Sequence, residues 1–236
     1  MIYVISDLHG CFALYQRLLE TVHFSDADTL YLLGDAADRG PDGIAVLLDV
    51  MQRPNVVMLR GNHEDMFLRV IRDHETGSKF LSRFSAWRTF NNWTECNGGL
   101  VTWEAYLALP EAQQIAIRDY LLGLPLFREL TVNGRHFLLV HAGVGDYAPD
   151  KRPEDCDPMD LIWTRMDYTE TYYEDKYLVT GHTPTVLIDR ALQGKIFRGN
   201  NHIVVDCGAV FFGTLGCICL DTMEEIYVSE PPHPDE

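Results

Sequence analysis

Polar residues of the kinds that bind metal ions follow five short apolar runs that we interpret as strands. The segments after these runs are Asp7-Leu8-His9-Gly10, Gly34-Asp35, Gly61-Asn62-His63-Glu64, His141-Ala142-Gly143 and Gly181-His182-Thr183. Because ligands of parallel α/β sheets bind beyond the carboxyl ends of the strands, we expect these side chains to meet at one edge. Aspartate, histidine and asparagine gathered in this way predict a metal site.

The spacing and number of these residues agree with that chemistry. Asp7 and His9 are two residues apart, so in an extended segment both side chains point to the same side. Asn62 and His63 are adjacent and therefore diverge. Two carboxylates, one amide and three imidazoles are too many ligands for one ion, but they suit two ions that share a bridging carboxylate. Two ions about 3.5–4 Å apart can activate a bridging water and stabilise a phosphoryl group during transfer. Nitrogen and oxygen ligands without thiolate suit manganese, iron or zinc.

The elements that must position these residues alternate along the chain. Short runs rich in Val, Ile, Leu and aromatic residues predict strands over 3–5, 30–33, 56–59, 137–140, 177–179, 203–206, 216–220 and 225–228. Apolar residues at helical spacing predict helices between the first three strands and over 64–74. This order is typical of parallel strands joined by crossover helices, and it places the chain in the α/β class with a mixed sheet.

The middle of the chain differs in composition from its flanks. Residues 77–136 are more polar and rich in Trp, Asn and Arg, with a helix predicted from Pro110 to Leu122 that Gly123 ends. We interpret this segment as a helical insert in one catalytic domain over 1–229. The Pro-rich acidic tail 230–236 is predicted to be disordered. The acid-rich segment 150–175 is predicted to be a solvated loop, with a role in substrate choice as the alternative.

The composition excludes several classes of protein. With 236 residues, 47% of them hydrophobic, the chain can form a large core and is not intrinsically disordered. The balance of 19 basic against 35 acidic residues gives a net charge of −16, which repels nucleic acid. No apolar run is long enough to cross a bilayer. The amino terminus lacks the features of a signal peptide and the six cysteines lack paired spacing, so we expect a cytoplasmic protein.

A second phosphatase chemistry is suggested by Cys11 and Arg17, which fit the Cys-x5-Arg pattern of cysteine-dependent phosphatases. That chemistry needs a small, Gly-rich loop whose amides surround the phosphate and lower the thiol pKa. The intervening Phe12, Leu14 and Tyr15 are bulky and have helical spacing. We therefore predict a helix here, with no nucleophilic cysteine.

Together the motifs resemble those of the phosphoprotein phosphatase family of metallophosphoesterases, closest to the compact phage-lambda and bacterial type. They are Asp7-Leu8-His9-Gly10, Gly34-Asp35-Ala36-Ala37-Asp38-Arg39-Gly40, Arg60-Gly61-Asn62-His63-Glu64, His141-Ala142-Gly143, Ile162-Trp163-Thr164-Arg165, Gly181-His182-Thr183 and Asp206-Cys207-Gly208-Ala209-Val210-Phe211. The likeness runs from about residue 2 to 229. It implies a calcineurin-like α/β/β/α sandwich with two mixed sheets.

The resemblance also implies a role for each residue of the predicted site. One metal ion would be held by Asp7 and His9, the other by Asn62, His141 and His182, with Asp35 bridging the two. Arg39 and Arg165 would bind the phosphate oxygens, for which a planar guanidinium is well shaped. His63, oriented by Asp38, would protonate the leaving alkoxide, which leaves poorly without a proton.

The implied function is a metal-dependent phosphomonoester hydrolase that dephosphorylates phosphoserine and phosphothreonine proteins. Its mechanism would be one-step, in-line attack by a hydroxide bound to two divalent ions, with manganese expected and iron or zinc as alternatives. The alternative function is a symmetrical dinucleoside-tetraphosphate hydrolase or another small-phosphoester hydrolase. Asp38 and Glu64 favour the protein phosphatase, because the dinucleotide subgroup often lacks the first and has Asp in place of the second. A silent metal-bound interaction module is disfavoured because no ligand is missing.

Other aromatic and histidine residues carry no motif. Trp87, Trp93, Trp103 and Tyr106 are predicted to pack in the core of the insert, with a substrate groove as the alternative. The remaining histidines are interpreted as surface or core residues: His23, His74, His136, His202 and His233.

Overall fold

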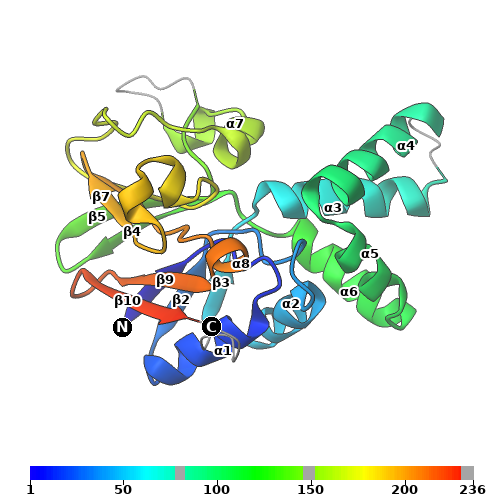
Figure 1. The fold of residues 1–236 in the computed structure, drawn as a ribbon, viewed down its shortest axis with the longest axis horizontal. Helices are drawn as coiled ribbons and strands as arrows, with labels where there is room; N and C mark the ends of the chain where they lie inside the picture. Colours follow the sequence, from blue (N-terminus) through cyan, green and yellow to red (C-terminus); the bar gives the residue numbers. More distant parts are fainter. Residues whose placement is uncertain (78–82, 146–151, 230–236) are drawn as a thin grey trace.

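Two five-stranded sheets pack face to face in the computed structural model, which describes residues 1–77, 83–145 and 152–229 (Figure 1). The first sheet has the order β10-β9-β1-β2-β3 and contains β1 (Ile2–Ile5), β2 (Thr29–Leu32), β3 (Val56–Met58), β9 (Thr214–Cys219) and β10 (Glu224–Ser229). The second has the order β4-β5-β6-β8-β7 and contains β4 (Phe127–Val132), β5 (Arg135–Val140), β6 (Tyr177–Thr180), β7 (Phe197–Gly199) and β8 (His202–Val204). Both sheets are mixed, as predicted.

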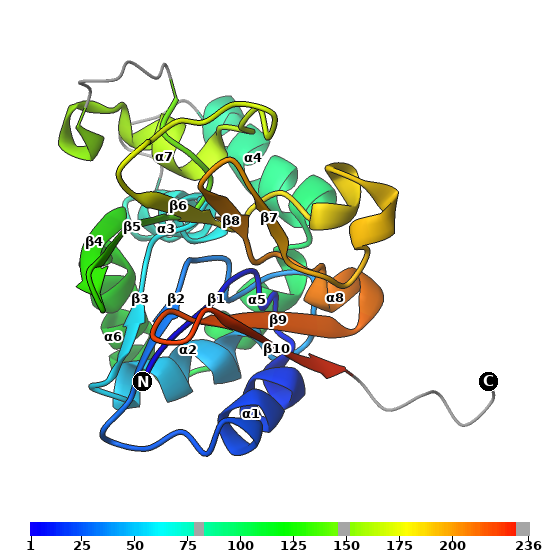
Figure 2. The ribbon, with the colours of Figure 1, turned by 90° about the vertical axis from the view of Figure 1, so that its left-hand side faces the viewer.

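Alternation along the strands builds the layers. In β1, Val4 faces the second sheet, whereas Tyr3 and Ile5 face the helices α1 (Phe12–Thr21) and α2 (Gly43–Gln52). In β5, Phe137 and Leu139 face the first sheet, whereas Leu138 and Val140 pack with α7 (Pro158–Trp163). Helices therefore cover the outer face of each sheet, and the view in Figure 2 shows this order of layers. The predicted α/β/β/α sandwich is confirmed.

The parallel strands follow the predicted crossovers. β1, β2 and β3 are parallel neighbours, and β5, β6 and β8 form a second parallel set. α1 and α2 connect the first three strands, and three residues separate β3 from α3 (Asn62–Glu75). The carboxyl ends of both parallel sets therefore meet at the edge where the predicted ligands lie.

The predicted helical insert 77–136 is wrong at its carboxyl end. Its helices are α4 (Arg83–Asn91), the π-helical turn η1 (Asn92–Cys96), α5 (Leu100–Leu107) and α6 (Glu111–Leu122), and α6 ends at Gly123 as predicted. Residues 127–136 instead form β4 and the start of β5, which pair antiparallel. Asn133 and Gly134 both have positive φ, 50° and 77°, which is the Asn-Gly hairpin turn that the sequence signals.

Two further predictions concern the tail 230–236 and the segment 150–175. The tail 230–236 lies outside the described residues. Within 150–175, the described part is not a simple loop, because it contains a 3-10 turn at Pro153–Asp155 and helix α7. Pro158 starts α7, and the Asp157 side chain accepts the Met159 N–H at 2.8 Å, which is a helix cap that the sequence carries.

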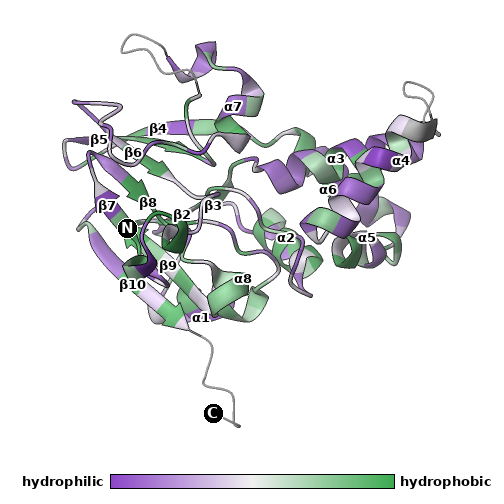
Figure 3. Ribbon diagram, turned by 45° about the horizontal axis from the view of Figure 1, so that its top comes forward, coloured by the Kyte–Doolittle hydropathy of each residue, from purple (hydrophilic) through white to green (hydrophobic). Residues whose placement is uncertain are grey.

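Polar and apolar residues are mixed along most elements. Strand β9 carries mostly apolar residues, whereas α3, α4 and α6 carry strongly polar residues beside apolar ones (Figure 3). Among the described residues, no helix combines the length and the apolar character needed to cross a membrane.

A pH-dependent contribution to stability is predicted at His202 in β8. His202 is 1% exposed, and burial lowers its pKa to about 4. The unfolded chain takes up this proton near pH 6.5, so protonation favours unfolding as the pH falls below that value. Between pH 7 and pH 5 the His202→Leu variant should therefore lose about 2 kcal/mol less unfolding free energy than the wild type. Urea denaturation at the two pH values measures this, and equal losses in both proteins would contradict it.

Candidate metal centre

The loops at the strand ends hold their polar residues in an uncommon backbone conformation. Asp7, His9, Asp35 and His182 have φ of 51°, 43°, 56° and 65°, in the left-handed region. Backbone hydrogen bonds fasten these loops to one another: Asp7 N–H donates to the Gly34 carbonyl at 3.1 Å, and His9 N–H to that of Asp35 at 2.9 Å. Strained, over-determined backbone of this kind clusters at functional sites.

Two imidazoles are oriented by backbone carbonyls outside the cluster. The Nδ1 of His9 lies 3.0 Å from the Ala37 oxygen, and the Nδ1 of His141 lies 2.7 Å from the Leu33 oxygen. A hydrogen on Nδ1 satisfies each carbonyl and leaves the lone pair on Nε2. Both Nε2 atoms face Asp35. An imidazole held through its other nitrogen in this way is typical of metal ligands.

Asp35 lies at the centre of the group. Its Oδ2 is 3.7 Å from Nε2 of His9 and its Oδ1 is 3.5 Å from Nε2 of His141, while Oδ1 of Asp7 is 3.9 Å from Nε2 of His9. Two ligand atoms about 2.1 Å from one ion at the tetrahedral angle lie about 3.4 Å apart. The separations therefore fit ligand atoms arranged around shared cations, with one oxygen of Asp35 on each side.

Asn62 completes the second group. Its Oδ1 is 2.9 Å from Nε2 of His141 and 3.0 Å from Nδ1 of His182. Because Nδ1 of His141 carries the hydrogen for Leu33, its Nε2 and the amide oxygen are two lone pairs facing each other. A cation between them removes that repulsion. Asp35, His141 and His182 form one triplet of potential metal ligands, and His9, Asp35 and His63 form another.

The burial of these groups also favours bound cations. Asp7, His9 and Asp35 are each at most 3% exposed. Burial, followed by the nearby Asp7 charge, raises the pKa of Asp35 well above its usual range. Burial lowers the pKa of His9, and it lowers the pKa of His182 to about 2. Divalent cations stabilise both charged carboxylates and neutral imidazoles, so this buried set fits a metal site.

Glu64 is an organising residue to which sequence reasoning gave no role. It is buried, and its carboxylate accepts N–H groups from Asp35 at 2.8 Å, Ala36 at 3.0 Å and Gly61 at 2.9 Å. Glu64 is the third residue of α3, and by accepting the N–H of Gly61, which precedes the helix, it supplies the glutamate half of a capping box. The carboxylate thus fastens the Asp35 loop to the start of α3.

His63 and Asp38 form the predicted pair beside the candidate metal ligands. The Nδ1 of His63 donates to Oδ2 of Asp38 at 2.6 Å, so Nε2 points to the open side, 3.9 Å from Oδ2 of Asp35. Burial raises the pKa of Asp38 to about 7, against the opposing effect of polar contacts with Thr102 and Trp93. Trp93 was predicted to pack in the insert core and does so, but its indole also donates to Asp38 at 2.6 Å.

Both predicted phosphate-binding arginines reach one pocket of about 180 Å³ next to this cluster. Arg39 is exposed, and its guanidinium lies within hydrogen-bond distance of Nε2 of both His9 and His63. Arg165 is also exposed, and donates to Oγ1 of Thr183 at 3.4 Å. Asp7, His9, Arg39, Arg165, His182, Leu187, Asp206 and Phe211 are among the residues that line the pocket. The structure therefore brings all ten predicted site residues to one edge of the sandwich.

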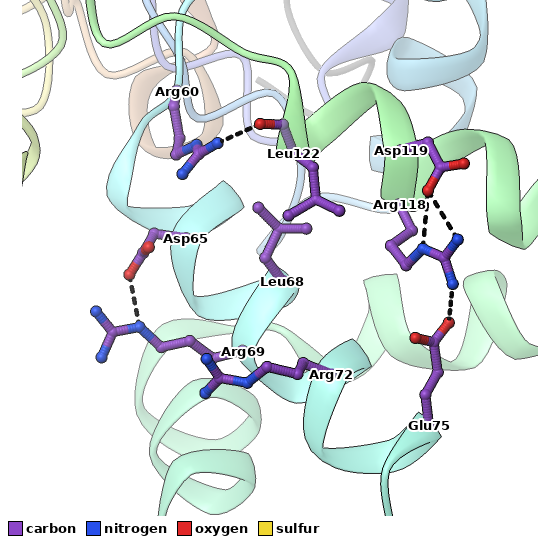
Figure 4. Close-up of a pocket in the computed structure, with 9 residues that line it drawn as sticks. All are labelled: Arg60, Asp65, Leu68, Arg69, Arg72, Glu75, Arg118, Asp119 and Leu122. Carbon is purple, nitrogen blue, oxygen red and sulfur yellow. Dashed lines mark hydrogen bonds and ion pairs between the residues drawn. The ribbon is translucent and has the colours of Figure 1, made fainter. Parts of the chain in front are cut away.

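A larger hollow of about 570 Å³ lies between α3 and α6, away from these residues (Figure 4). Its arginines are held by neighbouring groups: Arg69 pairs with Asp65 at 2.7 Å, and Arg118 with Glu75 at 2.8 Å. Arg60 donates to the Leu122 carbonyl at 2.8 Å, at the end of α6. We interpret the polar residues that line this hollow as the contacts that hold α6 against α3.

The Cys-x5-Arg pattern lies on a helix, as predicted. Cys11 precedes α1, Arg17 belongs to it, and the Arg17 guanidinium donates to the Ser229 carbonyl at 2.7 Å. The residues between them form helical turns, so no loop of amides surrounds the thiol.

Comparison with known proteins agrees with this arrangement. A bis(5'-nucleosyl)-tetraphosphatase PrpE of the asymmetrical type, from Geobacillus sp. (strain WCH70), is 27% identical, with 95% of this chain and 92% of that protein covered. A symmetrical bis(5'-nucleosyl)-tetraphosphatase from Paracidovorax citrulli (strain AAC00-1) is 35% identical over 61% of this chain and 44% of its own length. The solved structure of a candidate diadenosine tetraphosphatase shares the fold, with a TM-score of 0.67 at 19% identity, covering 98% of this chain and 94% of that one. The profile of the calcineurin-like phosphoesterases matches residues 1–186. The chain therefore belongs to the calcineurin-like phosphoesterase family, whose members are metallophosphoesterases.

Proposed function

We propose that this protein hydrolyses dinucleoside polyphosphates, such as diadenosine tetraphosphate, with two bound divalent metal ions. The observation that carries the proposal is the similarity to the Geobacillus tetraphosphatase along nearly the whole of both chains. The alternative function considered from the sequence thus becomes the leading one. Dephosphorylation of phosphoproteins becomes the second candidate.

The metal ligands in this proposal are the residues whose lone pairs converge on Asp35. Asp7 and His9 would hold one ion, Asn62, His141 and His182 the other, and Asp35 would contact both. Two divalent ions supply a nucleophile at neutral pH and neutralise charge on the reacting phosphoryl group. Manganese is the proposed metal, with iron and zinc as alternatives that suit the same donor set.

The remaining site residues act on the substrate. Arg39 and Arg165 would bind non-bridging phosphate oxygens, because both guanidinium groups reach the pocket that Asp7 and His9 line. His63 would hold a proton at Nε2 for the leaving oxygen, while Asp38 fixes the ring through Nδ1.

An exposed apolar rim beside this pocket favours a substrate with a flat apolar part. Phe211 is 57% exposed and Leu187 is 66% exposed, and both line the pocket. The Arg39 guanidinium lies 5.3 Å from the centre of the Phe211 ring, so the phosphate-binding group and the aromatic face are adjacent. A nucleobase can stack on such a face while its phosphates contact the arginine.

The pairing of His63 with Asp38 is the observation that favours the second candidate. A serine or threonine alkoxide is a poor leaving group and needs a proton, whereas a nucleotide phosphate leaves with far less help. The ring of His63 is fixed by its 2.6 Å hydrogen bond to Asp38. A proton donor oriented in this way would accelerate hydrolysis of a phosphomonoester more than that of a dinucleoside polyphosphate.

The two functions are separated by comparing substrates with manganese and then with EDTA. We expect diadenosine tetraphosphate to be cleaved with the higher kcat/KM and a phosphoserine peptide with the lower, because the rim offers a stacking face. Chromatography of the products distinguishes ATP plus AMP from two ADP. Manganese-dependent release from the peptide alone would establish the second candidate instead. Activity that survives EDTA on both would contradict the two-metal proposal.

Replacing Asp35 by Asn should remove metal and activity together, because the bridging carboxylate charge is lost. Metal content after dialysis, measured by mass spectrometry, should fall from two ions per chain to one or none. The matched control is Asp65→Asn, which neutralises an acid paired with Arg69 on α3. Full metal content in Asp35→Asn would refute the assignment of this residue as a ligand.

Replacing Phe211 by Ala should raise KM for diadenosine tetraphosphate by about 5- to 150-fold, since stacking of one base contributes about 1–3 kcal/mol. p-Nitrophenyl phosphate has no base, and its kcat/KM should change far less. The control is Phe212→Ala, which removes a neighbouring exposed ring that does not line the pocket. Equal effects of the two variants on the dinucleotide would argue against stacking on Phe211.

A further inference from the structure

Trp93, deep in the helical insert, directs its indole N–H at the proposed proton-donor pair. Trp93 is 0% exposed, and its Nε1 donates to Oδ2 of Asp38 at 2.6 Å. The same oxygen accepts the Nδ1–H of His63, also at 2.6 Å. The other oxygen, Oδ1 of Asp38, is buried and has no hydrogen-bond partner among the residues that the structure describes. Two N–H donors therefore share one oxygen, and together they fix the rotation of the carboxylate.

The insert also holds the backbone of the same turn. The Asp38 N–H donates to Oγ1 of Thr102 at 2.9 Å, and the Arg39 N–H donates to the Gly98 carbonyl at 2.9 Å. Asp38 and Arg39 have φ of 71° and 66°, a conformation that residues with a Cβ adopt reluctantly. With the bond from Trp93, three hydrogen bonds therefore join the insert to the turn that carries Asp38 and the proposed phosphate-binding Arg39.

The approach of the insert depends on two adjacent glycines. A Cβ on Gly99 would lie 2.2 Å from the Trp93 ring, and a Cβ on Gly98 would lie 2.9 Å from Cγ of Arg39. Gly98 also has a positive φ of 74°. The π-helical turn Asn92–Cys96 carries Trp93 into this contact, and such turns are frequent at functional sites.

Packing prevents the indole from turning away. Trp93 stacks on Phe67 of α3, with ring centres 5.1 Å apart and planes inclined by 16°. Trp103 of α5 packs edge-on against it at 6.2 Å. Since α3 begins with Asn62 and His63, one stack of rings connects the insert to the helix that presents the site.

We infer that Trp93 is a positioning residue for the Asp38–His63 pair, and that Thr102 and Gly98 serve the same purpose through the backbone. The helical insert would then be part of the catalytic apparatus as well as a cover for α3. Without the indole N–H, a buried carboxylate oxygen loses a donor and the carboxylate can rotate, so His63 is no longer held toward the leaving oxygen. The inference rests on the proposed role of His63 as proton donor, and it does not depend on which phosphoester is the natural substrate.

The test uses Trp93→Phe, which keeps an aromatic ring in the stack and removes only the N–H and part of the ring. Activity of the manganese-loaded enzyme is measured on aryl phosphates whose leaving groups have increasing pKa. For phenyl phosphate, whose leaving group needs a proton, kcat should fall by about ten- to a hundredfold, the effect of one hydrogen bond to a charged group. For p-nitrophenyl phosphate the fall should be much smaller, and KM should change little for either.

Trp103→Phe is the matched control, because it makes the same substitution in the same cluster of rings at a residue that does not donate to Asp38. It should affect all leaving groups alike. In the Asp38→Asn background, Trp93→Phe should cause no further loss on phenyl phosphate, since the acceptor through which it acts has changed. Circular dichroism and metal content confirm that each variant is folded and loaded.

The outcomes separate the positioning role of Trp93 from the proton-donor role of His63. Equal loss on every leaving group in Trp93→Phe, or full additivity with Asp38→Asn, would overturn the positioning role and leave Trp93 as a core residue. His63→Asn, measured on the same series, tests the proton donor itself. If that variant shows no dependence on the leaving group, the acid assignment fails independently of Trp93.

Discussion

The carboxylate of Glu64 is the contact on which the rest of the site depends. It accepts backbone N–H groups from the loops that follow β2 and β3, while its own residue lies in the first turn of α3. Each of these N–H groups is buried, and leaving one without an acceptor costs about 1–3 kcal/mol. One side chain thus holds together two strand ends and a helix start. Asp35 can lie between two sets of imidazoles only because its backbone is anchored in this way.

The second constraint is that the site lies where the two sheets meet. His141 follows β5 of the second sheet, and its Nδ1 bonds to the carbonyl of Leu33, which follows β2 of the first sheet. The His182 N–H donates to Oδ2 of Asp7 at 2.9 Å, again from one sheet to the other. Neither sheet carries the complete set of proposed ligands. The apolar packing between the sheets is therefore also what brings these residues together, and separating the sheets would disperse them.

Much of the fold and of the candidate site could be predicted from the sequence. The proposed ligands follow apolar runs that end at Asp, Gly or Asn, and strand ends in a parallel sheet converge. The contact of Trp93 with Asp38 could not, because it joins residues 55 positions apart through the packing of an insert without strand periodicity. The end of the insert was misplaced for a different reason. The Asn133-Gly134 turn is a strong local signal, but Phe127–Val132 alternates too weakly in hydropathy for a strand to be predicted there. Local patterns thus located the residues proposed to contact metal and phosphate, and missed those that hold them from a distance.

The charge of the chain bears on how substrate choice can arise. A net charge of −16 repels a polyphosphate at long range, so attraction must come from groups within about one Debye length, roughly 8–10 Å. Arg39 and Arg165 line one pocket with Asp7 and His9, and in the proposed function they and the bound cations would be such groups. In that role they would bind a phosphate of any phosphoester equally well, which gives affinity without selectivity. Selectivity must then come from uncharged surface at the rim, and Phe211, stacked against Arg39 and open to solvent, is placed where a phosphate and a base can be recognised together.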